Sequence, residues 1–270
     1  MSIPPRIAGR ISESELILNP DGSVYHLHLL PEQIAPTIIT VGDPERVDMV
    51  SRYFDHVEHR VQKREFITHT GRIGNNPVTV ISTGIGTDNI DICLNELDAL
   101  VNIDLSTRTV KPQHTALDIV RIGTSGCLHD DIPLGSFLAS DYGLGLDGLM
   151  LYYEAPQHPK ADALYDALWA YARAHNQRFP LPPTVAKASE SLLQRFASEE
   201  ILHGITLTAT GFYAPQNRQL RVKSTINELL ELLRGFSFED LRITNFEMET
   251  AGIYGLCEIF GHRALSLNVL

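Results

Sequence analysis

The chain has 270 residues, of which 43% are hydrophobic and 20% are charged. This length is sufficient for one large hydrophobic core, because single cores stop growing at roughly 250–300 residues. The formal net charge of −11 makes nucleic acid an unsuitable partner, and no stretch approaches the ~20 apolar residues that a membrane span requires.

Seven short runs of apolar and β-branched residues, each ending at glycine or a turn residue, predict strands. In chain order they cover residues 37–41, 78–82, 118–122, 135–140, 204–210, 242–246 and 264–270. Segments with apolar residues at helical spacing lie between many of these runs. They predict one helix that starts near residue 88 and others over residues 160–174, 190–202, 225–233 and 248–260. This alternation predicts an α/β fold with a central mixed β-sheet flanked by helices.

We interpret residues 1–270 as a single domain, because the sequence contains no internal repeat, low-complexity tract or long linker. Residues 1–22 are expected to form an N-terminal extension. The proline-rich stretch 179–183 predicts a surface loop between two helices, inside a surface insertion of about residues 156–188. The first fifteen residues hold no continuous apolar run, so we expect no signal peptide. The three scattered cysteines indicate a reducing compartment, and together these features favour a cytoplasmic protein.

Two predicted strands end in residues suited to binding an anion. The strand 37–41 is followed by Gly42 and Arg46, where backbone N–H groups and a forked cation could meet a phosphate. The strand 118–122 contains Arg121 and is followed by Thr124 between two glycines. The alternatives are an ordinary strand–turn–helix junction with a solvated Arg46, and an internal pair between Arg121 and a carboxylate.

Two later strand ends carry residues suited to a nucleoside. After the strand 204–210, Gln216 and Arg218 offer a carboxamide beside a cation, which suits a heterocycle such as uracil, and Phe212 offers a ring for stacking. After the strand 242–246, Met248 and Glu249 could contact the apolar face and the hydroxyls of a ribose. The alternatives are a polar loop, and acidic residues that complement a helix dipole.

Other motifs are excluded by their spacing. The glycines at 84 and 86 lack the third glycine of a dinucleotide-binding loop, and the segment 123–126 does not have the spacing of a serine hydrolase elbow. His26 and His28 form an H-x-H pair in a strand-like segment, but no third metal-ligating residue lies at a spacing typical of a metal site. We therefore predict no metal site and expect the two histidines to be exposed or at an interface.

The order of the motifs resembles the uridine phosphorylase branch of the nucleoside phosphorylase superfamily. The series runs through GDPER at 42–46, REF at 64–66, STGIG at 82–86, RIGTSG at 121–126, QNR at 216–218 and EME at 247–249. It covers the chain from about residue 23 onward. The resemblance implies a three-layer nucleoside phosphorylase fold and a pentosyltransferase of nucleotide salvage, which converts uridine and phosphate to uracil and ribose 1-phosphate.

The resemblance also implies roles for individual residues. Phosphate would be held by residues from three loops and a neighbouring subunit, namely Gly42, Arg46, Arg121, Thr124 and the neighbour's Arg64. The ribose would be held by Glu249 and Met248, with His26 from the neighbour at the 5′-hydroxyl. The base would lie against Phe212 and be read by Gln216 and Arg218. The arginines and Gln216 would stabilise the transition state, and shared sites imply a homo-oligomer built from dimers, commonly a hexamer.

No redox cofactor or catalytic metal is implied, since phosphate itself is a co-substrate. Some relatives bind a monovalent cation at a subunit interface through a glutamate that Glu65 matches, but Asn89 replaces a serine of that site. Relatives also carry a loop and helix after the last strand, and that contribution to the base site is expected to fall beyond Leu270. The alternatives are a purine nucleoside phosphorylase, a nucleosidase that uses water, and a noncatalytic nucleoside-binding protein.

Overall fold

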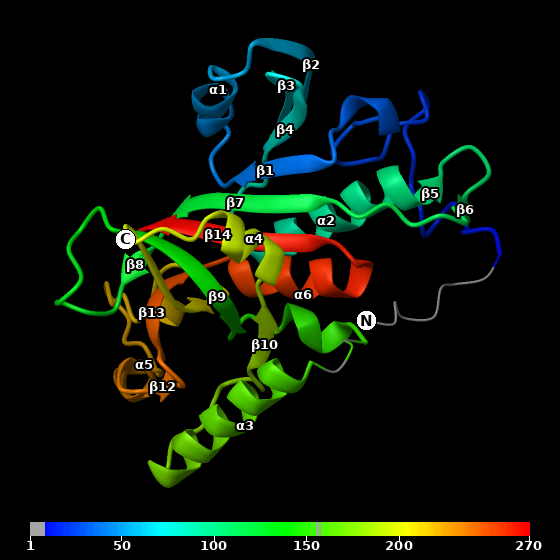
Figure 1. The fold of residues 1–270 in the computed structure, drawn as a ribbon. Coiled ribbons are helices and arrows are strands. Elements are labelled where there is room, and N and C mark those ends of the chain that lie inside the picture. Colours follow the sequence, from blue (N-terminus) through cyan, green and yellow to red (C-terminus); the bar gives the residue numbers. More distant parts are fainter. Residues whose placement is uncertain (1–8, 155, 157) are drawn as a thin grey trace.

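The computed structural model describes residues 9–154, 156 and 158–270, so part of the predicted N-terminal extension and residue 157 of the predicted insertion lie outside the described residues. Within these residues, twelve strands form one mixed sheet in the order β12-β13-β11-β9-β14-β7-β1-β4-β3-β2, with β10 beside β9 and β8 beside β13. Figure 1 shows β7 and β14 at its centre. The strands are β1 (Thr37–Val41), β2 (His56–Lys63), β3 (Phe66–Ile73), β4 (Asn76–Ser82), β7 (Asp118–Thr124), β8 (Gly126–Cys127), β9 (Phe137–Gly145), β10 (Thr184–Lys187), β11 (Ile201–Thr208), β12 (Ser237–Phe238), β13 (Leu241–Glu247) and β14 (Arg263–Val269). The predicted α/β fold with a central mixed sheet is confirmed.

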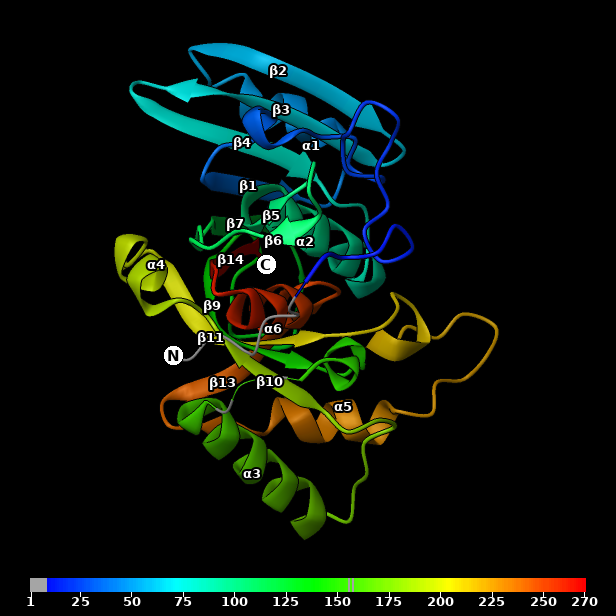
Figure 2. The same ribbon diagram turned by 90° about the vertical axis from the view of Figure 1, so that its right-hand side faces the viewer.

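Helices lie on both sides of this sheet, and a separate two-stranded ribbon, β5 (Ile103–Asp104) with β6 (Thr109–Val110), follows α2. The helices are α1 (Glu45–Ser51), α2 (Thr87–Asn102), α3 (Pro159–Ala174), α4 (Glu190–Arg195), α5 (Asn227–Arg234) and α6 (Thr250–Phe260), with short 3-10 turns η1 (Pro31–Gln33), η2 (Leu149–Tyr152) and η3 (Ala214–Gln216). Figure 2 shows β2, β3 and β4 at one end of the molecule and α3 and α5 at the other.

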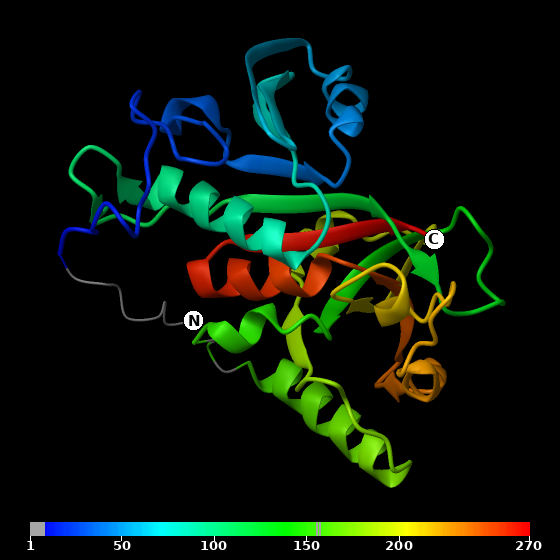
Figure 3. The ribbon, with the colours of Figure 1, turned by 180° about the vertical axis from the view of Figure 1, so that it is seen from behind.

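The main hydrophobic core lies between α2, α6 and the central strands. Five apolar residues of α2 recur at three- and four-residue steps and are buried, namely Ile90, Cys93, Leu94, Leu97 and Leu100. Helix α6 is apolar around most of its circumference and is buried accordingly. Figure 3 shows α2 and α6 next to each other in front of β7 and β14. This packing fixes the start of each helix beside the ends of the central strands.

Each predicted strand and helix exists in the structure, but several boundaries differ. The helix predicted over 190–202 is wrong in its second half. Helix α4 ends at Arg195, and Ile201 and Leu202 instead begin β11, where they pair with Phe137 and Leu138 of β9. The predicted helix at 248 begins at Thr250, because the Glu247 carboxylate accepts the N–H groups of Glu249 and Thr250.

The sequence did not predict the hairpin of β2 and β3. Alternate residues of β2 are exposed, and β3 buries polar side chains such as Thr68, His69 and Thr70. Neither segment is an apolar run, so the criterion that found the central strands missed them. The segment of His26 and His28 is a turn and not a strand, with His28 at φ 56°. The proline-rich stretch 179–183 leads from α3 into β10, so it does not join two helices directly.

Among the residues that the structure describes, no helix is both long and apolar enough to cross a lipid bilayer.

Candidate active site

A cavity of about 850 Å³ opens where the loops after five strands converge. Strand β14 pairs with β7 in parallel and with β9 in antiparallel fashion, so the strands on its two sides run in opposite directions. The segments after β1, β4, β7, β11 and β13 nevertheless line the same cavity. Its lining residues are Gly42, Asp43, Pro44, Arg46, Glu65, Gly84, Ile85, Asn89, Arg121, Gly123, Thr124, Ser125, Gly126, Phe212, Gln216, Arg218, Phe246, Glu247, Met248 and Glu249.

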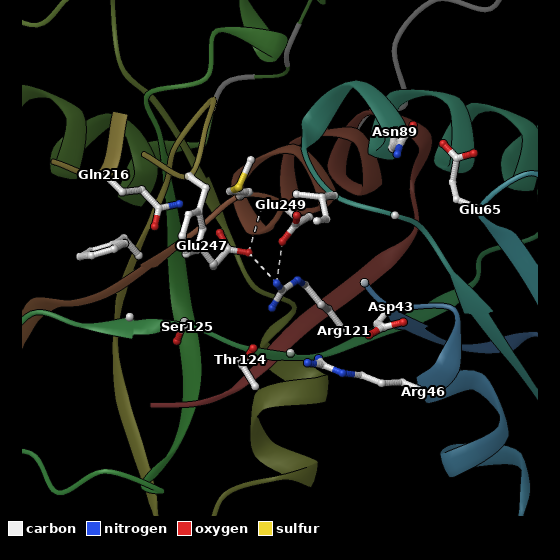
Figure 4. A pocket seen from close by; sticks show the side chains of 18 of the residues that line it. Asp43, Arg46, Glu65, Asn89, Arg121, Thr124, Ser125, Gln216, Glu247 and Glu249 are labelled. Carbon is white, nitrogen blue, oxygen red and sulfur yellow. Dashed lines mark hydrogen bonds and ion pairs between the residues drawn. The ribbon is translucent and has the colours of Figure 1, made fainter. Parts of the chain in front are cut away.

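Arg121 is buried at the inner end of this cavity and is held by two carboxylates. Its Nη2 donates to Glu249 Oε2 at 2.6 Å and lies 3.1 Å from Glu247 Oε2, as Figure 4 shows. Burial alone would lower the pKa of Arg121, but the two carboxylates raise it. The structure therefore contains the internal Arg–carboxylate pair that the sequence left open. One partner in the pair, Glu249, is itself a predicted site residue, so pairing does not remove Arg121 from the site.

The guanidinium of Arg121 packs directly against the backbone of Gly123, and we call this contact the seat of Arg121. A Cβ atom at position 123 would stand 2.2 Å from Nη1 and 2.6 Å from Cζ of Arg121. Both distances are shorter than van der Waals contact, so any side chain here would displace the guanidinium. The first glycine of the RIGTSG motif thus has a packing role that follows from Arg121.

Glu247 is a buried carboxylate that the sequence placed in a motif but gave no role. Its oxygens accept hydrogen bonds from the Thr208 hydroxyl at 2.8 Å and from two N–H groups at the start of α6. Burial raises its pKa to about 7, with the Glu249 charge adding to the effect and Arg121 opposing it. Burial thus favours the neutral form of Glu247 more than that of an exposed glutamate, next to Arg121.

Glu249 joins two parts of the cavity wall. Its Oε2 accepts from Arg121, and its Oε1 accepts the N–H of Gly86 at 2.8 Å. Gly86 is the residue before α2 and has φ 95°, a conformation that favours glycine. Met248 lies beside them, since its Cε would be 4.0 Å from a Cβ at position 86. The carboxylate predicted for the ribose is thus fixed from two sides.

The loop after β11 supplies the other end of the cavity. The Gln216 side chain is buried, whereas Phe212 is 51% exposed. Arg218 Nη1 donates to Gln216 Oε1 and to the Phe212 carbonyl, and the guanidinium carbon lies 3.9 Å from the centroid of the Phe212 ring. The centroid of the Phe246 ring lies 5.2 Å from the same carbon atom. Contacts of this kind attract a cation to an aromatic face, so both rings help to hold Arg218.

The loop after β1 brings Arg46 to the inner end. Figure 4 shows Arg46 and Arg121 pointing into the same part of the cavity, with Thr124 beside them. The predicted phosphate residues Gly42, Arg46, Arg121 and Thr124 are thus gathered together. Arg46 and Arg121 thus bring two cations to this end of the cavity, where Glu247 and Glu249 also lie.

Two predicted site residues stand apart from this cavity within the described chain. Arg64 lies in the turn between β2 and β3, with φ 53°, and does not line the cavity. His26 lies in a turn where its Nδ1 is 2.6 Å from Glu96 Oε1. Both were predicted to act in the cavity of a neighbouring subunit, which stays a prediction. Glu65 and Asn89, considered for a cation, do line the cavity, on either side of Gly84.

The sequence missed other residues that touch the site, among them Ser125, Phe246 and Asn268. Asn268 Oδ1 accepts from Arg121 Nη1 at 2.8 Å, and Ser125 Oγ accepts from Asn245 at 2.8 Å. The sequence signal for Asn268 is weak, since it is one of two polar residues, with Ser266, in the mostly apolar strand 264–270.

Comparison with known proteins places this cavity in context. The family described as "Phosphorylase superfamily" matches residues 36–270. A uridine phosphorylase of Thermococcus kodakarensis is 29% identical over 90% of this chain and 75% of its own, and one of Haemophilus influenzae is 28% identical over 89% and 82%. The crystal structure of a Trypanosoma brucei nucleoside phosphorylase, described as showing uridine phosphorylase activity, superimposes with a TM-score of 0.81 and 28% identity, covering 94% of this chain and 89% of that one.

Proposed function

The chain belongs to the phosphorylase superfamily, and on this premise we propose that it cleaves a pyrimidine nucleoside by phosphorolysis. Uridine and phosphate would give uracil and ribose 1-phosphate, the reaction of a pentosyltransferase in nucleoside salvage. The observation that carries the proposal is the division of one cavity into two ends. Arg46, Arg121 and Glu249 lie at one end, and Gln216 with Arg218 at the other.

The inner end suits phosphate and the ribose. Arg46, Arg121, Thr124 and the backbone at Gly42 hold the phosphate, since guanidinium groups match phosphate oxygens in geometry and charge. The Arg121 guanidinium carries five N–H groups, and its hydrogen bonds to Glu249 and Asn268 use two of them. The others remain for Glu247 and an anion. Glu249 accepts from the ribose hydroxyls, and Met248 packs on the sugar.

The outer end suits a pyrimidine. The Gln216 oxygen is engaged by Arg218, so its amide nitrogen is free to donate to a carbonyl oxygen of the base. Arg218 donates to a second carbonyl, and Phe212 lies beside the ring. A purine has a different pattern of donors and acceptors, so this pair favours uracil over hypoxanthine.

The reaction breaks the bond between the anomeric carbon and the base nitrogen and forms a bond from that carbon to a phosphate oxygen. Positive charge develops on the ribose and negative charge on the departing base. The phosphate stabilises the first, and donors from Gln216 and Arg218 stabilise the second. Preorganised donors aimed at charge that develops in the transition state often contribute more to catalysis than any other effect. We propose that no redox cofactor or catalytic metal takes part, and we keep a monovalent cation near Glu65 as the alternative.

We propose further that the protein works as a cytoplasmic homo-oligomer built from dimers, with a hexamer as the expected assembly. Support comes from Arg64 and His26, which lie outside the cavity of their own chain within the described residues. A neighbouring copy would then complete the phosphate and 5′-hydroxyl contacts.

The test is cleavage of uridine, thymidine and inosine, followed by ultraviolet absorbance with and without phosphate. Loss of uridine that requires phosphate, with inosine inert, is the expected result. Cleavage without phosphate would instead indicate a nucleosidase, and turnover of inosine would indicate a purine nucleoside phosphorylase. Binding of uridine with no turnover of any nucleoside would indicate a noncatalytic binding protein.

A further inference from the structure

A chain of buried polar side chains crosses the sheet beneath the cavity. Asn268 on β14 donates from its amide nitrogen to Ser140 Oγ at 3.2 Å and to Ser266 Oγ at 3.1 Å. Ser140 Oγ lies 2.6 Å from Thr206 Oγ1, and Thr206 donates to Asn245 Oδ1 at 2.8 Å. Buried polar groups of this kind are costly unless each finds a partner. Here each of these side chains has a hydrogen-bond partner.

The two ends of this chain touch the cavity lining. At one end Asn268 Oδ1 accepts from Arg121 Nη1, and at the other Asn245 Nδ2 donates to Ser125 Oγ. The orientation of the Asn268 amide is therefore fixed. Its oxygen must face the guanidinium, which can only donate, and its nitrogen must face the two hydroxyls.

Asn268 contacts a part of the Arg121 guanidinium that the hydrogen bond and ion pair to the two carboxylates do not involve. Glu247 and Glu249 both contact Nη2, so on their own they hold the guanidinium at one terminal nitrogen. The contact from Asn268 is to the other terminal nitrogen, Nη1. Two separate points of attachment define the plane of the group and prevent it from pivoting about the first.

The neutrality of Asn268 is also important. Arg121 already faces two carboxylates, and a third acidic acceptor would surround the cation with negative charge. An amide oxygen supplies the second attachment without adding charge. The cation therefore keeps more of its field for an incoming anion.

We propose that Asn268 is a positioning residue for phosphate binding, which acts by fixing the plane of the Arg121 guanidinium. This inference rests on the proposed function, because it takes phosphate as the anion that Arg121 meets. Asn268 does not line the cavity and does not touch substrate. Its effect should therefore appear in the use of phosphate and much less in the use of uridine.

The experiment compares Asn268→Ala with the wild type in phosphate-dependent cleavage of uridine. In Asn268→Ala, the buried guanidinium of Arg121 loses a hydrogen-bond acceptor. The loss of such a hydrogen bond from a charged group should raise the KM for phosphate about 10-fold to 100-fold. The KM for uridine should change little. Leu267→Ala is the matched control, since this neighbour on β14 packs against the main core and does not contact Arg121. It should lower the melting temperature while leaving the KM for phosphate unchanged.

A second variant guards against loss of folding in Asn268→Ala. Ser140→Ala keeps Asn268 and removes one hydroxyl that holds its amide, so we expect a smaller rise in the same KM. The inference would be overturned if folded Asn268→Ala had an unchanged KM for phosphate, or if Leu267→Ala raised this KM equally. If Asn268→Ala does not fold, the inference would be overturned by Ser140→Ala if that variant showed no rise in the KM for phosphate. If the wild type itself shows no phosphate-dependent cleavage, the proposed function fails instead, and the two failures are thus distinguishable.

Discussion

The two ends of the cavity are built in different ways. At the inner end, Arg121, Glu247 and Glu249 are buried and hold one another through ion pairs and hydrogen bonds to the sheet and to α2 and α6. At the outer end, Arg218 lies in an irregular loop that follows β11, in contact with two aromatic rings. That loop exposes large apolar side chains, namely Phe212, Tyr213, Leu220 and Val222.

The difference follows from what each end must bind. A phosphate dianion needs cations at fixed positions, and a buried cation is tolerated only where carboxylates and amides surround it. Stability and phosphate binding are thus coupled at the inner end. A base is planar and uncharged, so a loop with a few donors and rings is sufficient to read it, and such loops change with little effect on the core. Changes at the inner end should therefore affect both folding and rate, whereas changes at the outer end should affect specificity.

The largest effect is expected from Arg121→Ala. Removal of the cation leaves two buried carboxylates unpaired, which should lower the free energy of unfolding by about 3–5 kcal/mol. The kcat/KM for phosphate should fall by about 10³-fold, as when a preorganised charge-stabilising donor is lost. Urea unfolding and phosphate-dependent rates measure the two effects. Arg242→Ala breaks an exposed Arg–carboxylate pair with Asp131 and is the control. Unchanged phosphate dependence in Arg121→Ala would contradict the role of this residue.

Gly123→Ala tests the seat of Arg121 without removing any charge. The new methyl group would collide with the guanidinium, and a displacement of about 1 Å at a catalytic group can lower a rate about 10²-fold. We expect a loss of that order in kcat/KM for phosphate, measured in the same assay. Gly235→Ala, where a Cβ would stand 3.0 Å from the Tyr171 hydroxyl outside the cavity, provides the comparison. An equal loss of kcat/KM for phosphate in both variants would show that the loss does not depend on the position of Arg121.

Gln216→Ala tests the outer end, where the opposite pattern is expected. Loss of donors to the base should lower kcat/KM for uridine by about 10-fold to 100-fold. The KM for phosphate and the melting temperature should stay close to those of the wild type. Steady-state rates with each substrate varied in turn provide the measurement. The assignment of the two ends would be reversed if phosphate affinity collapsed while uridine affinity was retained.

The smallest effect concerns pH. Burial raises the pKa of Glu247 to about 7, so this carboxyl is largely protonated below pH 7 and ionised above it. Ionisation gives the group of Arg121, Glu247 and Glu249 a net charge of −1, which disfavours a dianion. Sulfate stays a dianion over this range, so its inhibition constant should rise about threefold to tenfold between pH 6 and pH 8. Glu247→Gln should flatten that rise. A rise of the same size in Glu247→Gln would assign the titration to another group.

The sequence predicted much of the inner end because its chemistry is local to strand ends. Arg46 and Arg121 stand beside glycines at the ends of apolar strands, and β1 has the predicted bounds. The partners of Arg121 could not be predicted, since Asn268 lies 147 positions away and is brought to it by the pairing of β7 with β14. The hairpin of β2 and β3 was missed for a related reason, because its polar strands are recognisable only from the pairing of β2 with β3 and of β3 with β4.

Phosphorus-31 nuclear magnetic resonance of a mixture of uridine, phosphate and the wild-type protein distinguishes phosphorolysis from hydrolysis. We expect a sugar phosphate signal to grow as the phosphate signal falls, in step with the uracil released. Release of uracil with the phosphate signal unchanged would contradict this expectation, because the bond would then have been cleaved by water and the arginines at the inner end would have another purpose.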